Sequence, residues 1–286
     1  MNKKSKSKKD FGSIVFSFFT KLACFLTFFV LLYLIFHIIS NGIRHINLDL
    51  FAWNYTTENV SMMSSIITTL ILVFLAILIS GPLGVFTGFY LVEYANKGSK
   101  LVDLIRLSAE TLSAIPSIIY GLFGMLFFVN RLNFSYSILS GVLTVAIMIL
   151  PLIIRSTEEA LLSVDQDLRN GSFALGAGKL RTIFKVVLPT AMPGIVAGII
   201  LAIGRIVGET AALLYTLGST TKMPNSIFSS GRTLALHMYV LSNEGFHVNQ
   251  AYATGVILLV LVIILNQLSV YLSNKLTGVK KWVKLK

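Results

Sequence analysis

The feature that most constrains this chain is a series of long stretches without a charged side chain. The longest runs from Asn59 to Val92 and contains no Asp, Glu, Lys or Arg. A bilayer core about 30 Å thick is crossed by roughly 20 apolar residues in a helix, so such a stretch is long enough to span a membrane. Charged residues make up only 13% of the chain, against roughly 25% in ordinary soluble domains. The pattern excludes a soluble globular fold and predicts an all-α polytopic membrane protein.

Several stretches of this kind occur, and we expect six transmembrane helices. They lie approximately at residues 22–39, 66–92, 107–130, 131–155, 191–217 and 244–275. The first follows a lysine-rich start, as in a secretory signal peptide, but it is 18 residues long and no small-x-small cleavage site follows it. We therefore interpret it as a span.

The distribution of Lys and Arg predicts how the chain is oriented in the membrane. Of these 24 residues, 19 fall in the two chain ends and in the second-to-third and fourth-to-fifth connections, four fall in the other connections, and Arg205 lies within a span. Since Lys and Arg accumulate on the cytoplasmic side, we expect both chain ends to be cytoplasmic. Topology and contact with anionic lipid explain the net charge of +12, and no basic stripe interleaved with aromatic residues indicates a nucleic-acid partner. The predicted organisation is a basic cytoplasmic segment at 1–21, a six-span unit at 22–274 with a cytoplasmic segment at 155–189, and a basic cytoplasmic tail at 275–286.

No residues are arranged in the pattern of a catalytic, metal or nucleotide site. The four histidines lack both the i, i+4 spacing and the acidic neighbours of a metal site, and the single cysteine, Cys24, lies in an apolar stretch. The run from Gly176 to Lys179 fails as a phosphate-binding loop, because Phe173 stands where the first glycine is needed and Leu180 where Ser or Thr would hold magnesium. We expect no metal, no cofactor and no enzymatic activity; if ATP drives this protein, another chain binds it.

The cytoplasmic segment 155–189 is long and polar enough to form structure outside the bilayer. Ser156 with Glu159, and Ser163 with Gln166, have the spacing of capping boxes, which predicts two short helices. The second of these helices is expected to stop at Gly176. Beyond it, apolar residues recur at helical spacing at positions 180, 183, 184 and 187, with basic residues between them. This pattern fits a helix lying on lipid and a helix that docks a soluble partner equally well.

The predicted fifth span carries a charge near its middle, at Arg205. A buried charge there costs about 2.5 kcal/mol or more, so an intramembrane arginine normally faces a partner or a water-filled path. Glu209, one turn further on and followed by Thr210, could neutralise it. Glycines at 194, 198, 204 and 208 form two small-x-x-x-small pairs that allow another helix to approach closely. Two interpretations stay open for Arg205: an ion pair that fixes packing, or a site on a transport path.

The predicted third span contains Pro116 between Ser113 and Ser117. Proline lacks an amide donor and frees a carbonyl, so a kink here is expected to expose polar backbone near these two hydroxyls. In the alternative interpretation the hydroxyls bond back to their own helix. Pro82 and Pro151 likewise indicate bends in the second and fourth spans.

The cytoplasmic segment and parts of the spans resemble the permeases of ABC-type importers. Their cytoplasmic signature is Glu-Ala-Ala, three residues, Gly, nine residues, then Ile-x-Leu-Pro. This chain has the sequence Asn-Gly-Ser at 170–172, Gly176 and Val-Val-Leu-Pro at 186–189, so the spacing fits throughout. Asn170 replaces the glutamate, which puts in doubt any salt bridge that the family's glutamate makes with an ATPase. Within these permeases the sequences at 110–124, 168–177, 204–211 and 234–245 are similar to the A subunit of the Pst phosphate-import system. The first and third are shared in looser form with its C subunit, and the last, with 211–218, resembles A more than C.

The resemblance implies a type I importer fold of the MetI kind with a cytoplasmic coupling helix, in a bacterial cell membrane. It implies a second permease subunit, a pair of ATPase subunits and an external phosphate-binding protein as partners. The ATPase would dock on Ser172, Phe173, Ala174, Leu175, Gly176 and Ala177. The expected path residues are Arg205, Glu209, Thr210, Ser113 and Ser117. The alternatives are a permease for another oxyanion, such as sulfate or molybdate, and a carrier or channel that works without an ATPase.

Overall fold

The computed structural model describes residues 11–96 and 98–277, and these residues form helices, turns and loops without a strand. The predicted all-α class is therefore confirmed. Most of the predicted basic end segments, residues 1–10 and 278–286, lie outside the described residues, as does Lys97.

Six crossings can be built from the helices of this protein, which is a multi-pass membrane protein. Five of them are helices that are long and apolar enough to span a bilayer. Within these five spans the labelled helices are α1 (Phe11–Gly42), α2 (Met63–Phe89), α5 (Ile138–Leu162), α8 (Leu188–Val207) and α11 (Val248–Thr277). The sixth crossing, third along the chain, is a bent pair made of α3 (Lys100–Ala114) and α4 (Ser117–Gly124). Pro82 and Pro151 lie inside α2 and α5 and break neither helix.

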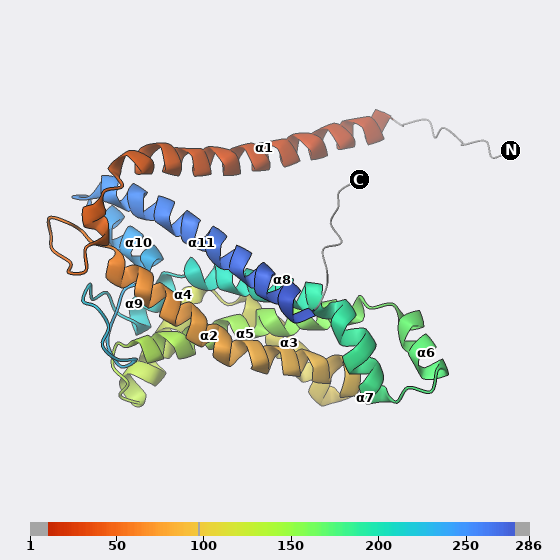
Figure 1. Ribbon diagram of the computed structural model, residues 1–286. Coiled ribbons are helices and arrows are strands. Elements are labelled where there is room, and N and C mark those ends of the chain that lie inside the picture. Colours follow the sequence, from red (N-terminus) through yellow and green to blue (C-terminus); the bar gives the residue numbers. More distant parts are fainter. Residues whose placement is uncertain (1–10, 97, 278–286) are drawn as a thin grey trace.

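The remaining elements are short. Helix α6 (Gln166–Ala174) follows α5, and α7 (Lys179–Thr182) continues through a π-helical turn into α8. Helices α9 (Ala211–Thr216) and α10 (Leu234–Glu244) lie between α8 and α11. Figure 1 shows α6 at one end of the molecule and α10 with the long loops at the other; α1 begins, and α11 ends, toward the end that carries α6. Both described chain ends therefore lie toward the same side as α6, as an even number of crossings requires.

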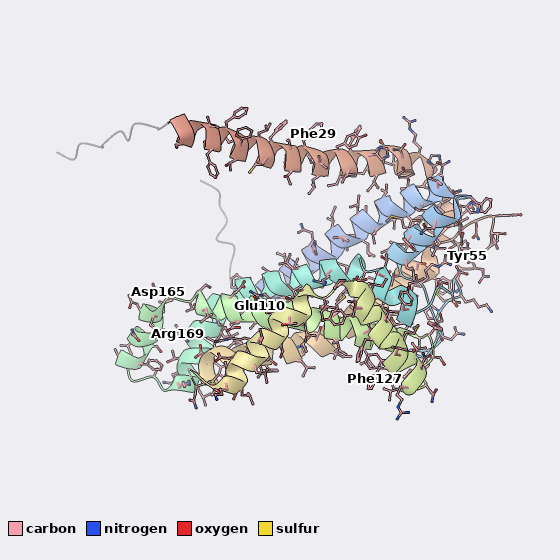
Figure 2. The ribbon with its side chains drawn as sticks, turned by 180° about the vertical axis from the view of Figure 1, so that it is seen from behind. Phe29, Tyr55, Glu110, Phe127, Asp165 and Arg169 are labelled. Atoms are coloured by element: carbon pink, nitrogen blue, oxygen red, sulfur yellow. The ribbon has the colours of Figure 1, made fainter. Side chains whose placement is uncertain are left out.

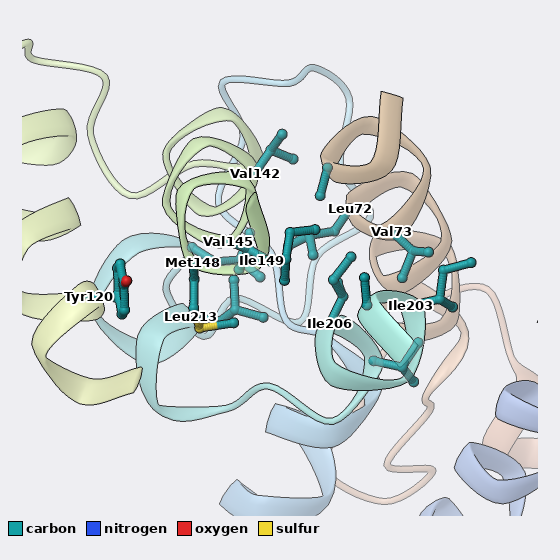
Figure 3. Close-up of a cluster of buried hydrophobic side chains, with 14 of the residues drawn as sticks. Leu72, Val73, Tyr120, Val142, Val145, Met148, Ile149, Ile203, Ile206 and Leu213 are labelled. Carbon is teal, nitrogen blue, oxygen red and sulfur yellow. The ribbon is translucent and has the colours of Figure 1, made fainter. Parts of the chain in front are cut away.

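The core is centred on α5, which packs against α2 and α8 (Figure 3). Leu72 of α2, Ile149 of α5 and Ile206 of α8 are almost fully buried there. Leu213 of α9 and Tyr120 of α4 close the cluster from the other side (Figure 3). The short helices are thus attached to the same core as the long ones.

Glycines let two helices approach α5 closely. On α2, Gly84 and Gly88 face Ile153 and Thr157, and a Cβ added to either glycine would lie within 3 Å of these side chains. On α8, Gly194 and Gly198 face Ala160 and Ser156 of α5, and a Cβ added to either glycine would again lie within 3 Å of the facing side chain. Lipid does not drive helices together as water does, so close packing of this kind supplies much of the attraction. One of the two predicted glycine pairs of the fifth span is therefore a contact within the chain.

Replacing Gly198 by valine is expected to destabilise the protein by about 1–3 kcal/mol, because the new side chain would overlap Ser156 in a filled interface. Thermal unfolding in detergent micelles measures this change. Gly12→Ala in α1 is the matched control, since nothing lies within 4 Å of a Cβ at that position. An unfolding temperature for Gly198→Val equal to that of the parent would contradict the close packing of α8 on α5.

Helix α1 differs from the others because it stands away from the bundle (Figure 1). Its contacts lie at its carboxyl end, where Gly42 packs on Tyr252 and Val256 of α11 and His37 lies 3.4 Å from the Tyr252 hydroxyl. Toward its amino end its large apolar side chains are exposed, and Figure 2 shows Phe29 pointing away from the other helices.

Candidate functional site

The third span is broken sharply where the sequence predicts a kink. Helix α3 ends at Ala114, α4 begins at Ser117, and their axes are bent by 101°. Pro116 has no amide to continue the ladder, so the carbonyl of Leu112 loses its i+4 partner. The Tyr120 hydroxyl donates a hydrogen bond of 2.8 Å to this carbonyl. The Ile115 amide donates to the same carbonyl at 3.2 Å, so one backbone donor and one side-chain donor close the break inside the membrane, where an unpaired carbonyl would be costly.

The two predicted path serines, Ser113 and Ser117, lie on opposite sides of this break. The Ser113 hydroxyl donates to the Glu110 carbonyl of its own helix at 2.7 Å, which is the alternative interpretation of its role. Ser117 is the first residue of α4 and is half-buried. Tyr120, which is not among the predicted site residues, has the more informative position; its bond partner lies across the bend, so no local sequence pattern indicates it.

The fifth span is also broken, and the expectation of a continuous helix from 191 to 217 is wrong. Helix α8 ends at Val207, and α9 starts only at Ala211. The Glu209 carboxylate accepts a 3.0 Å hydrogen bond from the Ala212 amide and so satisfies one of the free donors at the start of α9. A side chain that bonds locally to the backbone in this way competes with continuation of the helix.

The predicted ion pair between Arg205 and Glu209 is likewise absent from the described residues. Glu209 is 8% exposed and its carboxylate faces α9. Arg205, in the last turn of α8, is exposed. The two residues belong to different sides of the break, so the i, i+4 geometry that would join them does not form.

Arg205 instead lies between two glycines, Gly204 and Gly208, that have unfilled space beside them. A Cβ added at Gly204 would meet nothing within 4 Å, and one at Gly208 would meet only the Gly204 carbonyl. The second glycine pair of this span therefore borders a surface that the chain itself leaves unfilled.

The two breaks lie near each other. Gly121, one turn into α4, is in close contact with Ala212, the second residue of α9. Further along, Gly124 packs on Thr216 of α9 and Thr144 of α5. The structure thus brings together the start of α4, the start of α9 and the end of α8. Thr210, at the break, is half-buried and its side chain makes no capping bond.

Helix α6 is the short helix predicted to stop near Gly176. It runs from Gln166 to Ala174, and Gly176 adopts a positive φ of 79°, which closes the helix as expected. Both predicted capping boxes are wrong. Ser156 lies inside α5, which continues to Leu162, and the amino end of α6 is capped by Asp165, whose carboxylate accepts from the Asp167 amide at 3.0 Å.

The tip of α6 carries exposed apolar side chains. Leu175 is 90% exposed and Phe173 is 47% exposed. Ala174 and Gly176 are exposed beside them, Ser172 and Ala177 are half-buried, and the Ala177 amide donates to the Ser172 carbonyl at 3.1 Å. The six residues predicted to dock an ATPase thus form one compact turn at the end of the molecule.

Two ion pairs join the broken span to α5 on the α6 side of the break. Arg106 pairs with Glu158 at 2.7 Å, and Arg155 lies 3.8 Å from Glu110. They line a cavity of about 160 Å³ between α3 and α5. The side chains of three of the four residues are 44% or more exposed, so each pair contributes little to stability.

At the opposite end, in the α10 region outside the long helices, a buried arginine contacts a buried histidine. Arg232 donates to the Ser219 carbonyl at 3.0 Å and approaches Nδ1 of His237 at 3.3 Å. Burial, reinforced by the Arg232 charge, lowers the pKa of His237 from its ordinary 6.5 to about 4. His237 is therefore neutral at pH 7, with Nδ1 as an acceptor for Arg232.

Acidification should accordingly weaken the fold. Between pH 6.5 and 4 the unfolded chain binds a proton at His237 that the folded chain does not. The contribution of His237 to the free energy of unfolding is therefore fully present above pH 6.5. It decreases as the pH drops toward 4, by up to about 3 kcal/mol. Thermal unfolding in micelles from pH 7 to 4.5 measures this slope. His237→Asn, which keeps an acceptor for Arg232 but does not titrate, is expected to flatten it. An unchanged slope in the variant would assign the pH dependence to other groups.

Comparison with known proteins places the chain among membrane transport components. The family described as "Binding-protein-dependent transport system inner membrane component" matches residues 80–278. A probable ABC transporter permease protein, YqgI of Bacillus subtilis, is 39% identical over 211 residues, which are 68% of this chain and 71% of that protein. The phosphate transport system permease protein PstA of Xylella fastidiosa is 32% identical over 245 residues, covering 84% and 85%.

Other similarities concern length and fold. A PstA homolog of Mycoplasma genitalium is 34% identical over 94% of this chain, but the match spans only 42% of that protein. Among solved structures, a bacterial ABC transporter involved in the import of the acidic polysaccharide alginate has a chain that superposes with a TM-score of 0.56 at 17% identity, covering 91% of this chain and 98% of that one. At this identity the likeness concerns the fold, which agrees with the type I importer permease fold expected from the sequence.

Proposed function

Because this chain belongs to the family of binding-protein-dependent transport system inner membrane components, we propose that it is a permease subunit that imports inorganic phosphate with energy from ATP. Members of this family are membrane components without a nucleotide site, so a separate ATPase hydrolyses the ATP. The permeases named for phosphate transport in Xylella and Mycoplasma support phosphate as the substrate.

The observation that carries this proposal is the setting of Arg205. It ends a membrane helix at a break, between two glycines that face open space, without a carboxylate partner in the described part of the chain. An arginine left in lipid would cost about 2.5 kcal/mol or more. We infer that this face is covered by a second permease subunit, with water and the transported anion between the two.

Phosphate suits this arrangement chemically. The guanidinium group has five donors in a fixed fork, which match the oxygens of a tetrahedral oxyanion better than an ammonium group does. Since the Glu209 carboxylate bonds to the start of α9 and makes no ion pair with Arg205 among the described residues, the guanidinium is left to pair with the transported anion. Thr210, Ser113 and Ser117 remain proposed path residues at the two breaks.

The orientation and the partners follow from the same proposal. The end of the molecule that carries α6 would be cytoplasmic, as the excess of Lys and Arg there predicts, with both chain ends on that side of the bacterial membrane. A dimeric ATPase would dock on the apolar tip of α6, and an external phosphate-binding protein would deliver the anion at the opposite end. The divisions at 1–21, 22–274 and 275–286 are retained as a proposed organisation.

The transport cycle would alternate access between the two sides. Nucleotide can shift the permease only by binding one arrangement of the ATPase better than the other, and α6 must pass this preference to the spans. The broken spans are the parts of the membrane region whose backbone is already interrupted. We propose that they rearrange around Arg205.

Uptake into vesicles tests the proposal. The chain, its partner permease, the ATPase and the binding protein are reconstituted together, and entry of radiolabelled phosphate is followed with and without ATP. Uptake that requires ATP, and that unlabelled phosphate suppresses far better than sulfate or molybdate does, is expected. Suppression by sulfate or molybdate at equal concentration would reassign the substrate, and uptake by this chain alone would reject the dependence on an ATPase.

A further inference from the structure

The base of α6 is held to the membrane helices by one buried charge. Arg169, in the amino-terminal half of α6 that we call its base, forms an ion pair with Glu93, which lies in the π-helical turn at the end of α2. The guanidinium also donates to the Leu161 carbonyl near the end of α5 at 3.0 Å. The side chains of Arg169 and Glu93 are 13% and 7% exposed. A single side chain of α6 is therefore bonded to the ends of both α2 and α5, and Figure 2 labels it on that helix.

A second set of contacts surrounds the same point. Lys179, the first residue of α7, donates to the backbone carbonyl of Glu93, and its ammonium group lies 4.8 Å above the ring centre of Tyr94. Within the loop, the hydroxyls of Ser172 and Thr182 are 2.9 Å apart. Arg169 before the tip of α6 and Lys179 after it are thus both bonded to the end of α2.

The neighbouring residue does not share this role. Asn170 is exposed, and among the described residues its side chain hydrogen-bonds only to Gln166 of its own helix, whose amide donates at 3.4 Å. Leu175, six residues after Arg169, is almost fully exposed. Helix α6 therefore has a free apolar tip and a base fixed by Arg169.

We propose that Arg169 and Glu93 are positioning residues that convert movement of α6 into movement of α2. This inference rests on the proposed function, in which a partner pushes on the tip of α6. Removing one member of a buried pair leaves an uncompensated charge and costs far more than breaking an exposed pair such as Arg155 and Glu110. The buried link therefore stays intact while the exposed pairs between α3 and α5 are free to break. Because α2 packs on α5 through Gly84 and Gly88, a displacement of its end reaches the core.

The experiment measures two rates in the complete reconstituted complex: ATP hydrolysis and phosphate uptake. Glu93→Gln and Arg169→Gln are each expected to lower the phosphate taken up per ATP hydrolysed by about tenfold, a value within the range of ordinary coupling energies. The double variant, which leaves no unpaired charge, is expected to be no worse than either single variant, because the two residues act through one contact. Arg181→Gln is the matched control, since this basic residue of the same loop is exposed and makes no ion pair or hydrogen bond in the described structure.

Co-purification of the ATPase separates a positioning role from a structural one. A positioning role leaves the amount of assembled complex unchanged and lowers only the ratio; Arg169→Lys, which keeps the charge but loses the fork, is expected to give an intermediate ratio and remains informative if the glutamine variants do not assemble. A ratio equal to the parent's, or a parallel loss of assembly, hydrolysis and uptake in all variants including Arg169→Lys, would overturn the proposal. Absence of ATP-driven phosphate uptake in the parent would overturn the proposed function itself.

Discussion

Replacing Arg205 by alanine is expected to reduce ATP-driven phosphate uptake about 10- to 100-fold, with assembly of the complex unchanged. The estimate comes from the loss of charge-assisted hydrogen bonds worth about 1.5–3 kcal/mol. Assembly should persist because Arg205 makes no ion pair within the described part of the chain, and in the proposal water and the transported anion separate it from the partner permease. Vesicle uptake and co-purification measure the two quantities.

Lysine at the same position should give an intermediate rate. It keeps the positive charge but loses the planar fork that can hold two phosphate oxygens at once. Arg131→Ala is the matched control, because Arg131 is an exposed arginine that ends the π-helical turn after α4 and makes no ion pair in the described structure. Parental uptake in both Arg205 variants would remove this side chain from the mechanism.

Replacing Leu175 by aspartate is expected to abolish docking of the ATPase and reduce uptake to background. Leu175 is the most exposed side chain at the tip of α6. Burying a leucine in a partner groove contributes about 2 kcal/mol, and placing an unpaired carboxylate there costs several kcal/mol more, so binding should weaken about 100-fold or more. Co-purification of the ATPase with the membrane subunits provides the measurement.

A leucine at the opposite end of the molecule serves as the control. Leu48 is 89% exposed in a short turn after α1, so Leu48→Asp adds the same charge at a similarly exposed site far from α6. Retained ATPase binding in Leu175→Asp, or equal loss in Leu48→Asp, would contradict a docking role for the tip of α6.

The membrane crossings could be predicted from the sequence because a helix that spans a bilayer needs about 20 consecutive, mostly apolar residues. An uncharged stretch such as 59–92 has few alternatives in a bilayer. The sharp bend at Pro116 was also predictable, since proline removes a donor whatever surrounds it. The Tyr120 hydroxyl that repairs the break was not, because its partner, Leu112, lies two turns away across the bend.

Local competition for backbone amides explains most of the errors. Apolar residues lie on both sides of residues 208–210, and their pattern does not reveal that the Glu209 carboxylate bonds Ala212 rather than Arg205. In the same way, Ser163 has the spacing of a cap but Asp165 takes that role. Spacing identifies groups that are able to cap a helix; tertiary packing decides which of them does.

The contacts of α6 likewise could be predicted only where they depend on residues close in the sequence. Its end at Gly176 follows from glycine chemistry, whereas its bond to Glu93 joins residues 76 positions apart, and nothing in the sequence pairs them. The spacing of the loop was predictable, and the link that fixes its base had to be seen in the structure.

Helix α1 has a consequence for biogenesis. Because none of its described side chains is buried outside its last turns, we expect its insertion into the bilayer and the folding of the remaining bundle to be energetically separate events. Helix α1 is synthesised before α2 to α11, and we expect it to be stable in the bilayer before the remaining helices have packed together. Its apolar residues should thus tolerate exchange among themselves more freely than the buried residues of α5, such as Ile149 and Ile153, which pack in the core between helices.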